Sequence, residues 1–200
     1  MLYSMSSPGG PTRIAILDAA HELFAAEGYH GVGLERVAKR AGVSRQAVYL
    51  HFGSKGGLLL ELARYEHERT GISALADRTV WSAPDAAAAL DAWAALFAAF
   101  APEVLDFVRV LDGARRSDPD AAAVWRDQSE DRLQGCRRLA DWLKRDGVLT
   151  TGWTVSSAAD LIWAIASLQT YDELVIERGW RPSRFTRHIQ ETLRRTLLAP

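Results

Sequence analysis

Apolar residues recur every three or four positions along most of this chain, in segments separated by glycine, proline and serine. This period is typical of helices that bury one face, and no alternating run of β-branched residues predicts a strand. We therefore expect an all-α fold of about nine helices. They are predicted over residues 12–27, 34–41, 45–52, 55–72, 82–100, 102–115, 117–147, 154–178 and 182–198.

The composition is that of a folded protein of ordinary size. The 200 residues are 48% hydrophobic and 24% charged, which argues against global disorder. The formal net charge of −1 means that any contact with nucleic acid must come from a local basic patch. The single cysteine, Cys136, cannot form an internal disulfide, and the first residues lack the pattern of a secretory signal. No apolar stretch is long enough to span a bilayer, so we expect a soluble cytoplasmic protein without membrane contact.

Residues 34–52 have the pattern of a helix-turn-helix. Small Ala38 lets two helices cross closely, and Gly42 supplies the positive φ that the turn requires. Ser44 is placed to cap the second helix through its hydroxyl. Val48 and Phe52, four positions apart, point into the core. Such a motif also occurs as a purely structural corner, so its outward face decides the function.

The outward face of the second helix carries groups that suit a DNA major groove. Arg45 matches the two acceptors of guanine, and Gln46 matches the donor and acceptor of adenine. Ala47 lies beside them, and Tyr49 and His51 are suited to backbone phosphates. We therefore expect this helix to contact both bases and backbone.

The charge around the motif is positive. The segment from 36 to 55 contains five lysines and arginines and no acidic residue. Such a basic face attracts phosphates even on a nearly neutral chain, although part of it could be an ordinary solvated surface. The five cations are Arg36, Lys39, Arg40, Arg45 and Lys55.

The segment 12–60 resembles the DNA-binding domain of the tetracycline-repressor-like (TetR) transcriptional regulators. The likeness rests on three blocks in order, AAHELFAAEGY, VAKRAGVS and AVYLHFGSKGGLL. It implies that Ser44, Tyr49 and Lys55 hold phosphate, while Arg36 is expected at the DNA-binding surface from the charge pattern alone. Where the family commonly has Thr or Ser, this chain has Gly33, and its Gln46-Ala47 pair also departs from the family. The sequence of the operator is therefore expected to be its own.

The resemblance also implies a domain organisation and a function. It implies a helix-turn-helix domain (12–54) and a helical ligand-binding and dimerisation domain (55–200), which opens with a connecting helix (55–72). The Ser, Pro and Gly content of residues 1–11 indicates a disordered lead-in before them. The protein would be a homodimeric regulator, usually a repressor, which a small effector releases from a pseudo-palindromic double-stranded DNA operator. Two alternatives stay open: a constitutive DNA-binding dimer without an effector, and a helical small-molecule-binding protein or enzyme.

Seven tryptophans suggest an aromatic pocket for an apolar or flat effector. Ordinary core packing is the alternative for each of them. The resemblance places the pocket in the C-terminal helices, and its expected lining is Trp93, Phe97, Phe100, Phe107, Leu111, Trp125, Gln128 and Ser129.

The last two predicted helices suggest a dimer interface. The first of them is apolar almost all round, so it has to be covered on two sides. The resemblance implies a four-helix interface across a two-fold axis, and burial within one chain is the alternative. The expected interface residues are Trp163, Ala164, Ser167, Tyr171, Ile189, Leu193 and Leu197.

Enzymatic motifs find little support. The pair His21-Glu22 lacks the second histidine of a zinc-protease helix, because Ala25 stands there. Gly56 and Gly57 follow no predicted strand, so they do not form a phosphate loop. We expect no catalytic residue, cofactor or metal.

Overall fold

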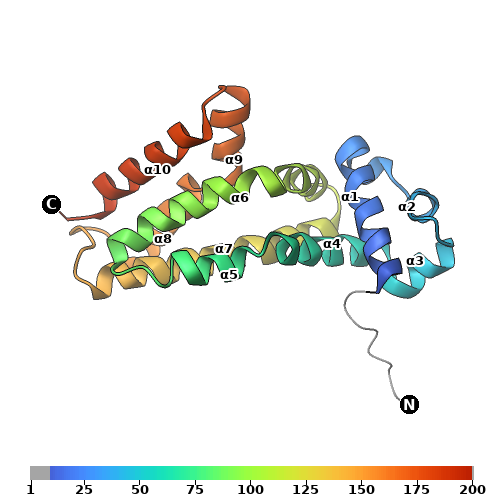
Figure 1. Cartoon of the computed structure of the whole chain (residues 1–200), viewed down its shortest axis with the longest axis horizontal. Helices are drawn as coiled ribbons and strands as arrows, with labels where there is room; N and C mark the ends of the chain where they lie inside the picture. Colours follow the sequence, from blue (N-terminus) through green and yellow to red (C-terminus); the bar gives the residue numbers. More distant parts are fainter. Residues whose placement is uncertain (1–9, 200) are drawn as a thin grey trace, which may run out of the picture. The chain divides into compact units, whose positions relative to one another are not determined.

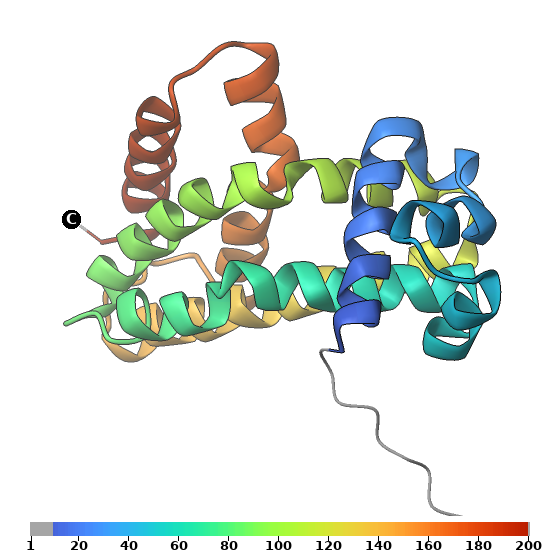
Figure 2. The ribbon, with the colours of Figure 1, turned by 45° about the vertical axis from the view of Figure 1, so that its right-hand side comes forward.

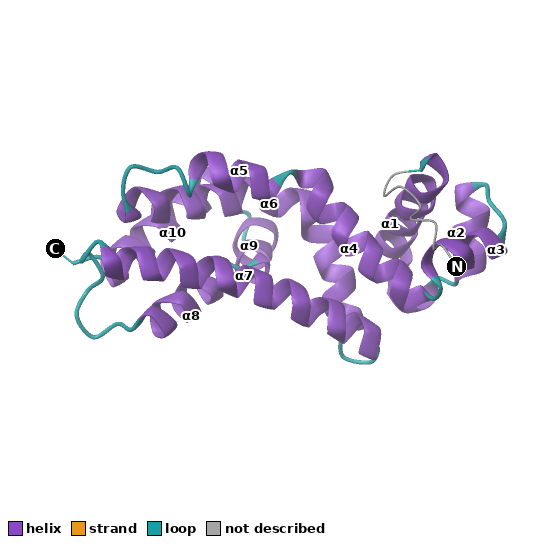
Figure 3. Ribbon diagram, turned by 90° about the horizontal axis from the view of Figure 1, so that it is seen from below, coloured by secondary structure: helices purple, strands orange, loops and turns teal. Residues whose placement is uncertain are grey.

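The computed structural model describes residues 10–199. Of the lead-in expected at 1–11, residues 1–9 lie outside the described part, while Gly10 caps the first helix and Pro11 begins it. The described residues form helices and no strand beyond a single bridge between Leu149 and Leu198, which confirms the all-α class (Figure 3). The elements are α1 (Pro11–Gly31), α2 (Leu34–Ala41), α3 (Arg45–Phe52), α4 (Lys55–Thr70), α5 (Ile72–Thr79), α6 (Ala86–Ala114), α7 (Pro119–Arg145), α8 (Val155–Ile165), α9 (Leu168–Tyr171), a π-helix (Asp172–Glu177) and α10 (Pro182–Leu197).

The chain divides into two compact units. The first contains the residues up to Arg69 together with Asp106–Arg126, and the second contains Thr70–Leu105 together with Asp127–Pro200. The division falls inside α6 and α7, so each of these long helices contributes to both units (Figure 1).

The core of the first unit is built from α1 to α4, the end of α6 and the start of α7. α1, α2 and α3 alternate buried apolar positions with exposed polar ones at helical spacing, so each presents one face to a shared centre. The fully buried large side chains at that centre include Ile16, Phe24, Leu58, Leu59, Leu62 and Leu111.

The second unit has its own core, formed by α5, most of α6, most of α7, α8, α9 and α10. Within this unit α10 lies beside the first half of α6 (Figure 2). Gln190 on α10 donates to the backbone carbonyl of Asp91, and Arg194 donates to the Asp91 carboxylate. Thr154 caps α8 through a reciprocal pair of bonds with Ser157, at the first residue of the helix predicted over 154–178.

The prediction of separate helices at 82–100 and 102–115 is wrong. α6 continues through Pro102 without a break. Proline removes one backbone hydrogen bond, but Ala101, Val104 and Leu105 are buried beside it, so core packing outweighs the lost bond. Pro102 itself is exposed, on the side of the helix where the ring meets solvent.

The prediction of one helix over 154–178 is also wrong. α8 ends at Ile165, Ser167 caps a new helix by accepting from the Thr170 backbone N–H at 3.1 Å, and a π-helix follows. Arg132 on α7 explains the break, because its guanidinium donates to the carbonyls of Trp163 (2.7 Å) and Ala166 (2.8 Å). These bonds satisfy carbonyls that a continuing helix would have used.

The connecting helix, predicted over 55–72, ends earlier. Gly71 adopts a left-handed conformation (φ 59°) after α4, and α5 begins at Ile72. The first helix, predicted over 12–27, extends to Gly31: Gly28 has a positive φ of 75°, but one further helical turn follows it.

Candidate nucleic-acid interface

α2 and α3 form the helix-turn-helix that the sequence predicts. Gly42 takes the left-handed conformation (φ 70°, ψ 27°), which turns the chain after α2. The Ser44 hydroxyl accepts from the backbone N–H of Ala47 at 3.1 Å and so caps α3. Ala38 and Val48 are buried between the helices. The inner face of α3 is therefore fixed in the core.

The outward face of α3 holds two rows of side chains. Arg45 and Tyr49 form one row: the guanidinium donates to the phenol oxygen at 3.2 Å and lies 5.4 Å from the ring centroid. Gln46 and Leu50 form the other row, since positions four apart lie on one side of a helix. All four side chains are exposed.

The remaining two predicted contacts on α3 are less accessible. Ala47 and His51 are half-buried, whereas Arg45, Gln46 and Tyr49 are exposed as expected. Leu50, which the sequence analysis did not single out, is 84% exposed. The signal that could have found it is its position, four residues after Gln46.

Two arginines of the basic segment are paired with acids from α1. Arg36 donates through both terminal nitrogens to the two carboxylate oxygens of Glu27, and Arg40 pairs with Glu22. The hydrogen bond from Arg36 lowers the pKa of Glu27, and the same bond raises the pKa of Arg36. The basic segment has no acid in the sequence, but the fold supplies two.

Lys55 begins α4 and lies against an aromatic pair. Its ammonium is 4.1 Å from the ring centroid of Tyr29 and 5.9 Å from that of Phe24. Burial lowers the pKa of Lys55, and the nearby carboxylate of Asp118 opposes that shift. The Ser54 hydroxyl accepts from the Gly57 backbone N–H at 2.9 Å, which caps the start of α4.

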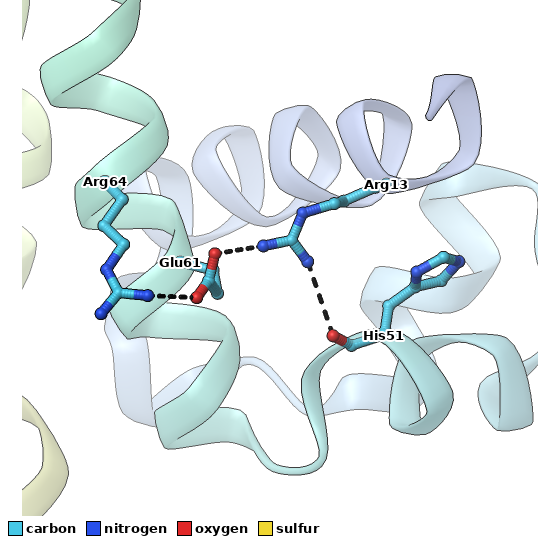
Figure 4. A network of polar contacts seen from close by, with 4 residues as sticks. All are labelled: Arg13, His51, Glu61 and Arg64. Carbon is cyan, nitrogen blue, oxygen red and sulfur yellow. Dashed lines mark hydrogen bonds and ion pairs between the residues drawn. The ribbon is translucent and has the colours of Figure 1, made fainter. Parts of the chain in front are cut away.

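Arg13 ties the end of α3 to α4, a role that the sequence analysis missed. Its guanidinium pairs with Glu61 on α4 and donates to the backbone carbonyl of His51 at 3.5 Å (Figure 4). Arg64 donates to the same Glu61 carboxylate at 2.7 Å. The carbonyl of His51 joins this network, and its imidazole does not.

A second cluster joins α1 to α4 deeper in the unit. His21 Nδ1 lies 2.8 Å from Glu66 Oε1, and Arg69 donates to the other oxygen of Glu66 at 2.7 Å. Glu66 is only 3% exposed. Burial alone would raise the pKa of Glu66, but the hydrogen bonds from His21 and Arg69 hold it below its usual value. The pKa of His21 is raised, mainly by its hydrogen bond to Glu66.

The residues expected to line an effector pocket are divided between two cores. Trp93 and Phe97 belong to the core of the second unit. Phe107 and Leu111 are buried in the core of the first unit, and Trp125 packs against it. The structure therefore does not bring this set into one core.

The other three expected pocket residues lie in the second unit. Phe100 and Ser129 are half-buried, and Gln128 is exposed. The backbone carbonyl of Ser129 accepts from the Trp163 indole N–H at 3.3 Å. Ser129 thus fixes a tryptophan through its backbone.

The residues expected at a dimer interface are mostly covered by their own chain. Trp163 is half-buried, with the Arg132 guanidinium 4.4 Å from its ring centroid, and Ala164 is exposed. Burial within one chain, the alternative given above, describes the other five: Ser167, Tyr171, Ile189, Leu193 and Leu197.

A metal site or a membrane span would each require a particular feature of the described residues. No group of three or more His, Cys, Asp or Glu side chains there is placed to hold a metal ion. In the same part of the chain, every helix is too short or too polar to cross a membrane. Cys136 is buried, and burial raises the pKa of its thiol to about 12.

Comparisons with known proteins agree with this geometry. Residues 16–62, which run from α1 into α4, match the family model described as "Bacterial regulatory proteins, tetR family". The HTH-type transcriptional regulator UidR of Escherichia coli (strain K12) is 33% identical over 69 residues, which are 34% of this chain and 35% of that protein. The HTH-type transcriptional repressor Rv1474c of Mycobacterium tuberculosis is 32% identical over 120 residues, 58% of each chain. The chain thus spans about a third of the length of the first relative and somewhat over half of the second.

The fold of almost the whole chain also occurs in solved structures. The transcriptional regulator FadR from Bacillus subtilis, in complex with stearoyl-CoA, has a TM-score of 0.74 and 20% identity, covering 90% of this chain and 96% of that one. At this identity the likeness shows the fold. Residues 16–62 thus form a helix-turn-helix domain of the tetR family of bacterial regulatory proteins, within a chain that shares its fold with solved regulators.

Proposed function

We propose that this protein is a transcriptional regulator that binds double-stranded DNA through α3. The observation that carries the proposal is the outward face of α3, where Arg45, Gln46 and Tyr49 are exposed on a helix whose opposite face is buried. A short helix held in this way can enter a major groove without first paying the entropy of becoming ordered.

Each exposed group has a chemical role on a duplex. Arg45 donates to guanine O6 and N7, and Gln46 bonds to adenine N6 and N7. Ser44, Tyr49, His51 and Lys55 contact backbone phosphates, and half-buried Ala47 permits a close approach of the helix to the groove. Arg36 reaches phosphate only by exchanging its bond to Glu27.

The regulator acts as a homodimer on a pseudo-palindromic operator. Two copies of α3 would occupy successive major grooves about 34 Å apart on one face of the duplex. Within the second unit, exposed Ala164 on α8 and Ile176 on the π-helix, which is 50% exposed, remain uncovered by their own chain. These two residues support a contact with a second copy.

The regulator is a repressor that a small apolar or aromatic effector releases. The support is the aromatic content of the second unit. There the ring centroids of Trp81 and Trp93 lie 5.9 Å apart, and the Arg132 guanidinium stacks on the ring of Trp163. The FadR structure of the same fold holds stearoyl-CoA. The protein works in the cytoplasm, where the chromosome lies, and it needs neither catalysis nor a cofactor.

Selection of bound sequences from a random DNA pool tests the DNA-binding proposal. We expect an inverted repeat, and Arg45→Ala should weaken binding about 5- to 150-fold at one base pair per half-site. Lys55→Ala should weaken binding to all sequences alike. An unenriched pool, or equal loss on specific and random DNA for Arg45→Ala, would overturn the proposal.

Tryptophan fluorescence tests the effector. Stearoyl-CoA and a panel of apolar and aromatic compounds would be titrated into the protein alone and into the protein–operator complex. A true effector changes the fluorescence and lowers operator affinity by about 5- to 150-fold. If no compound in the panel alters operator affinity, a constitutive dimer becomes the better description. If the protein turns over a compound and does not bind DNA, an enzyme becomes the better description.

A further inference from the structure

Leu50 is the most exposed large hydrophobic side chain in the described part of the chain. It is 84% exposed, while the next such residue, Ile176, is 50% exposed. It gains nothing from the core of its own chain, because Val48 and Phe52 supply the apolar contacts of α3. An apolar side chain held in water loses free energy that burial would recover.

Its neighbours define the kind of surface that Leu50 can contact. On the outward face of α3 it shares one row with Gln46, beside the row of Arg45 and Tyr49, and all three of these polar residues are exposed. A partner protein would need a contiguous apolar patch, and one leucine among polar groups does not form one. A polar groove with isolated apolar points fits this pattern better.

The DNA major groove offers one such apolar point. Thymine alone among the four bases presents a methyl group there, and the other edges present only donors and acceptors. A leucine side chain can neither donate nor accept a hydrogen bond, so thymine is the base with which it makes a favourable contact.

We propose that Leu50 contacts the C5-methyl group of a thymine and so selects an A·T base pair in the operator. This inference rests on the proposed DNA-binding function of α3 and names a base that the polar side chains do not specify. Residues four apart are about 6 Å apart along a helix axis, and successive bases are about 3.4 Å apart. The thymine therefore lies one or two base pairs from the adenine that Gln46 contacts.

Deoxyuridine substitution tests the contact directly, because it removes only the methyl group. The operator selected from a random pool would be resynthesised with each thymine replaced in turn, and affinity would be measured for the wild type and for Leu50→Ala. We expect one thymine per half-site at which deoxyuridine weakens wild-type binding about 3- to 10-fold. Leu50→Ala should bind both duplexes equally, at the weakened level.

A matched control separates the contact from general effects. Leu75→Ala makes the same change at a leucine that is 37% exposed on α5, and it should keep the full response to deoxyuridine. Because Leu50 is exposed, Leu50→Ala should melt at the wild-type temperature, so loss of binding will not reflect unfolding.

The outcomes distinguish this inference from the function beneath it. A wild type that binds its operator but shows no response to deoxyuridine, or the same response in Leu50→Ala, overturns the thymine contact and leaves the DNA-binding function standing. A wild type that enriches no sequence overturns both.

Discussion

Replacing Gly56 with alanine tests how the start of α4 meets the first turn of α7. A Cβ atom built at Gly56 would lie 1.8 Å from Oδ2, 2.4 Å from Cγ and 2.5 Å from Cβ of Asp120. Such separations are far below van der Waals contact, so one helix has to move. Both residues belong to the first unit, which contains the helix-turn-helix.

The size of the effect follows from two opposing terms. Alanine gains up to about 1 kcal/mol over glycine in a helix. Overpacking costs about 1–3 kcal/mol, and we expect the upper part of that range. The reason is that the Asp120 Cβ is fixed by its backbone, so turning the carboxylate away does not remove the clash. The net loss is about 1–2 kcal/mol, which lowers the melting temperature of a chain this long by about 2–8 °C.

Thermal melting of matched variants gives the measurement. Gly113→Ala is the control, because a Cβ at Gly113 in α6 meets nothing within 4 Å and should leave the melting temperature unchanged or slightly raised. Asp120→Gly removes all three clashing atoms and should restore the melting temperature of Gly56→Ala. Asp120→Ala keeps the Cβ atom and should not. If Gly56→Ala melts like Gly113→Ala, or if both second changes rescue it equally, the packing argument fails.

Three further predictions concern the polar contacts of the first unit. Glu27→Gln should free Arg36 and make the dependence of DNA affinity on salt steeper by about one unit per chain, as binding titrations at 50–200 mM salt would show. Ser44→Ala should cost about 0.5–2 kcal/mol in urea unfolding while Ser44→Gly costs a few tenths, and equal losses would exclude a capping role. Because Glu66 raises the pKa of His21, the stabilisation from that pair is complete below the ordinary histidine pKa of about 6.5 and is lost as pH rises through the raised value. His21→Gln should therefore flatten the decline in melting temperature between pH 6 and pH 9, and an unchanged decline would assign it to other groups.

The helix-turn-helix could be predicted from the sequence because its determinants are local. Gly42 and Ser44 act on backbone groups within three or four residues of themselves, so their roles are visible in a short window. The burial of Val48 and Phe52 follows from helical spacing in the same way. The positions of these residues in the structure match what the pattern indicates.

The features that could not be predicted depend on distant contacts. Arg132 ends α8 from 31 and 34 residues away, and nothing near Ala166 in the sequence announces it. Pro102 lies inside a helix because buried neighbours hold it there, whereas local propensity alone favours a break. In both places tertiary packing overrode a correct local preference.

The expected effector pocket shows a different limit of sequence analysis. Helical spacing identifies apolar faces, but it does not say which core a long helix faces along each part of its length. α6 contributes Phe97 to one core and Phe107 to the other, ten residues apart on a single helix. A set of aromatics chosen by helix membership therefore draws on two cores.

The pairing of charges in residues 36–55 determines how strongly the DNA affinity of a single chain depends on salt. Arg36 and Arg40 are paired with glutamates and Arg45 is assigned to a base, so of the described residues 36–55 only Lys39 and Lys55 are cations left to contact phosphate. Two such cations give a slope of about −1.8 for log affinity against log salt, which is about a 12-fold loss between 50 and 200 mM. Two copies on one duplex give about −3.6, or about 150-fold. A measured slope near −4 would therefore mean that the glutamates keep their arginines on DNA, and a slope near −9 would mean that all five cations of each copy engage phosphate.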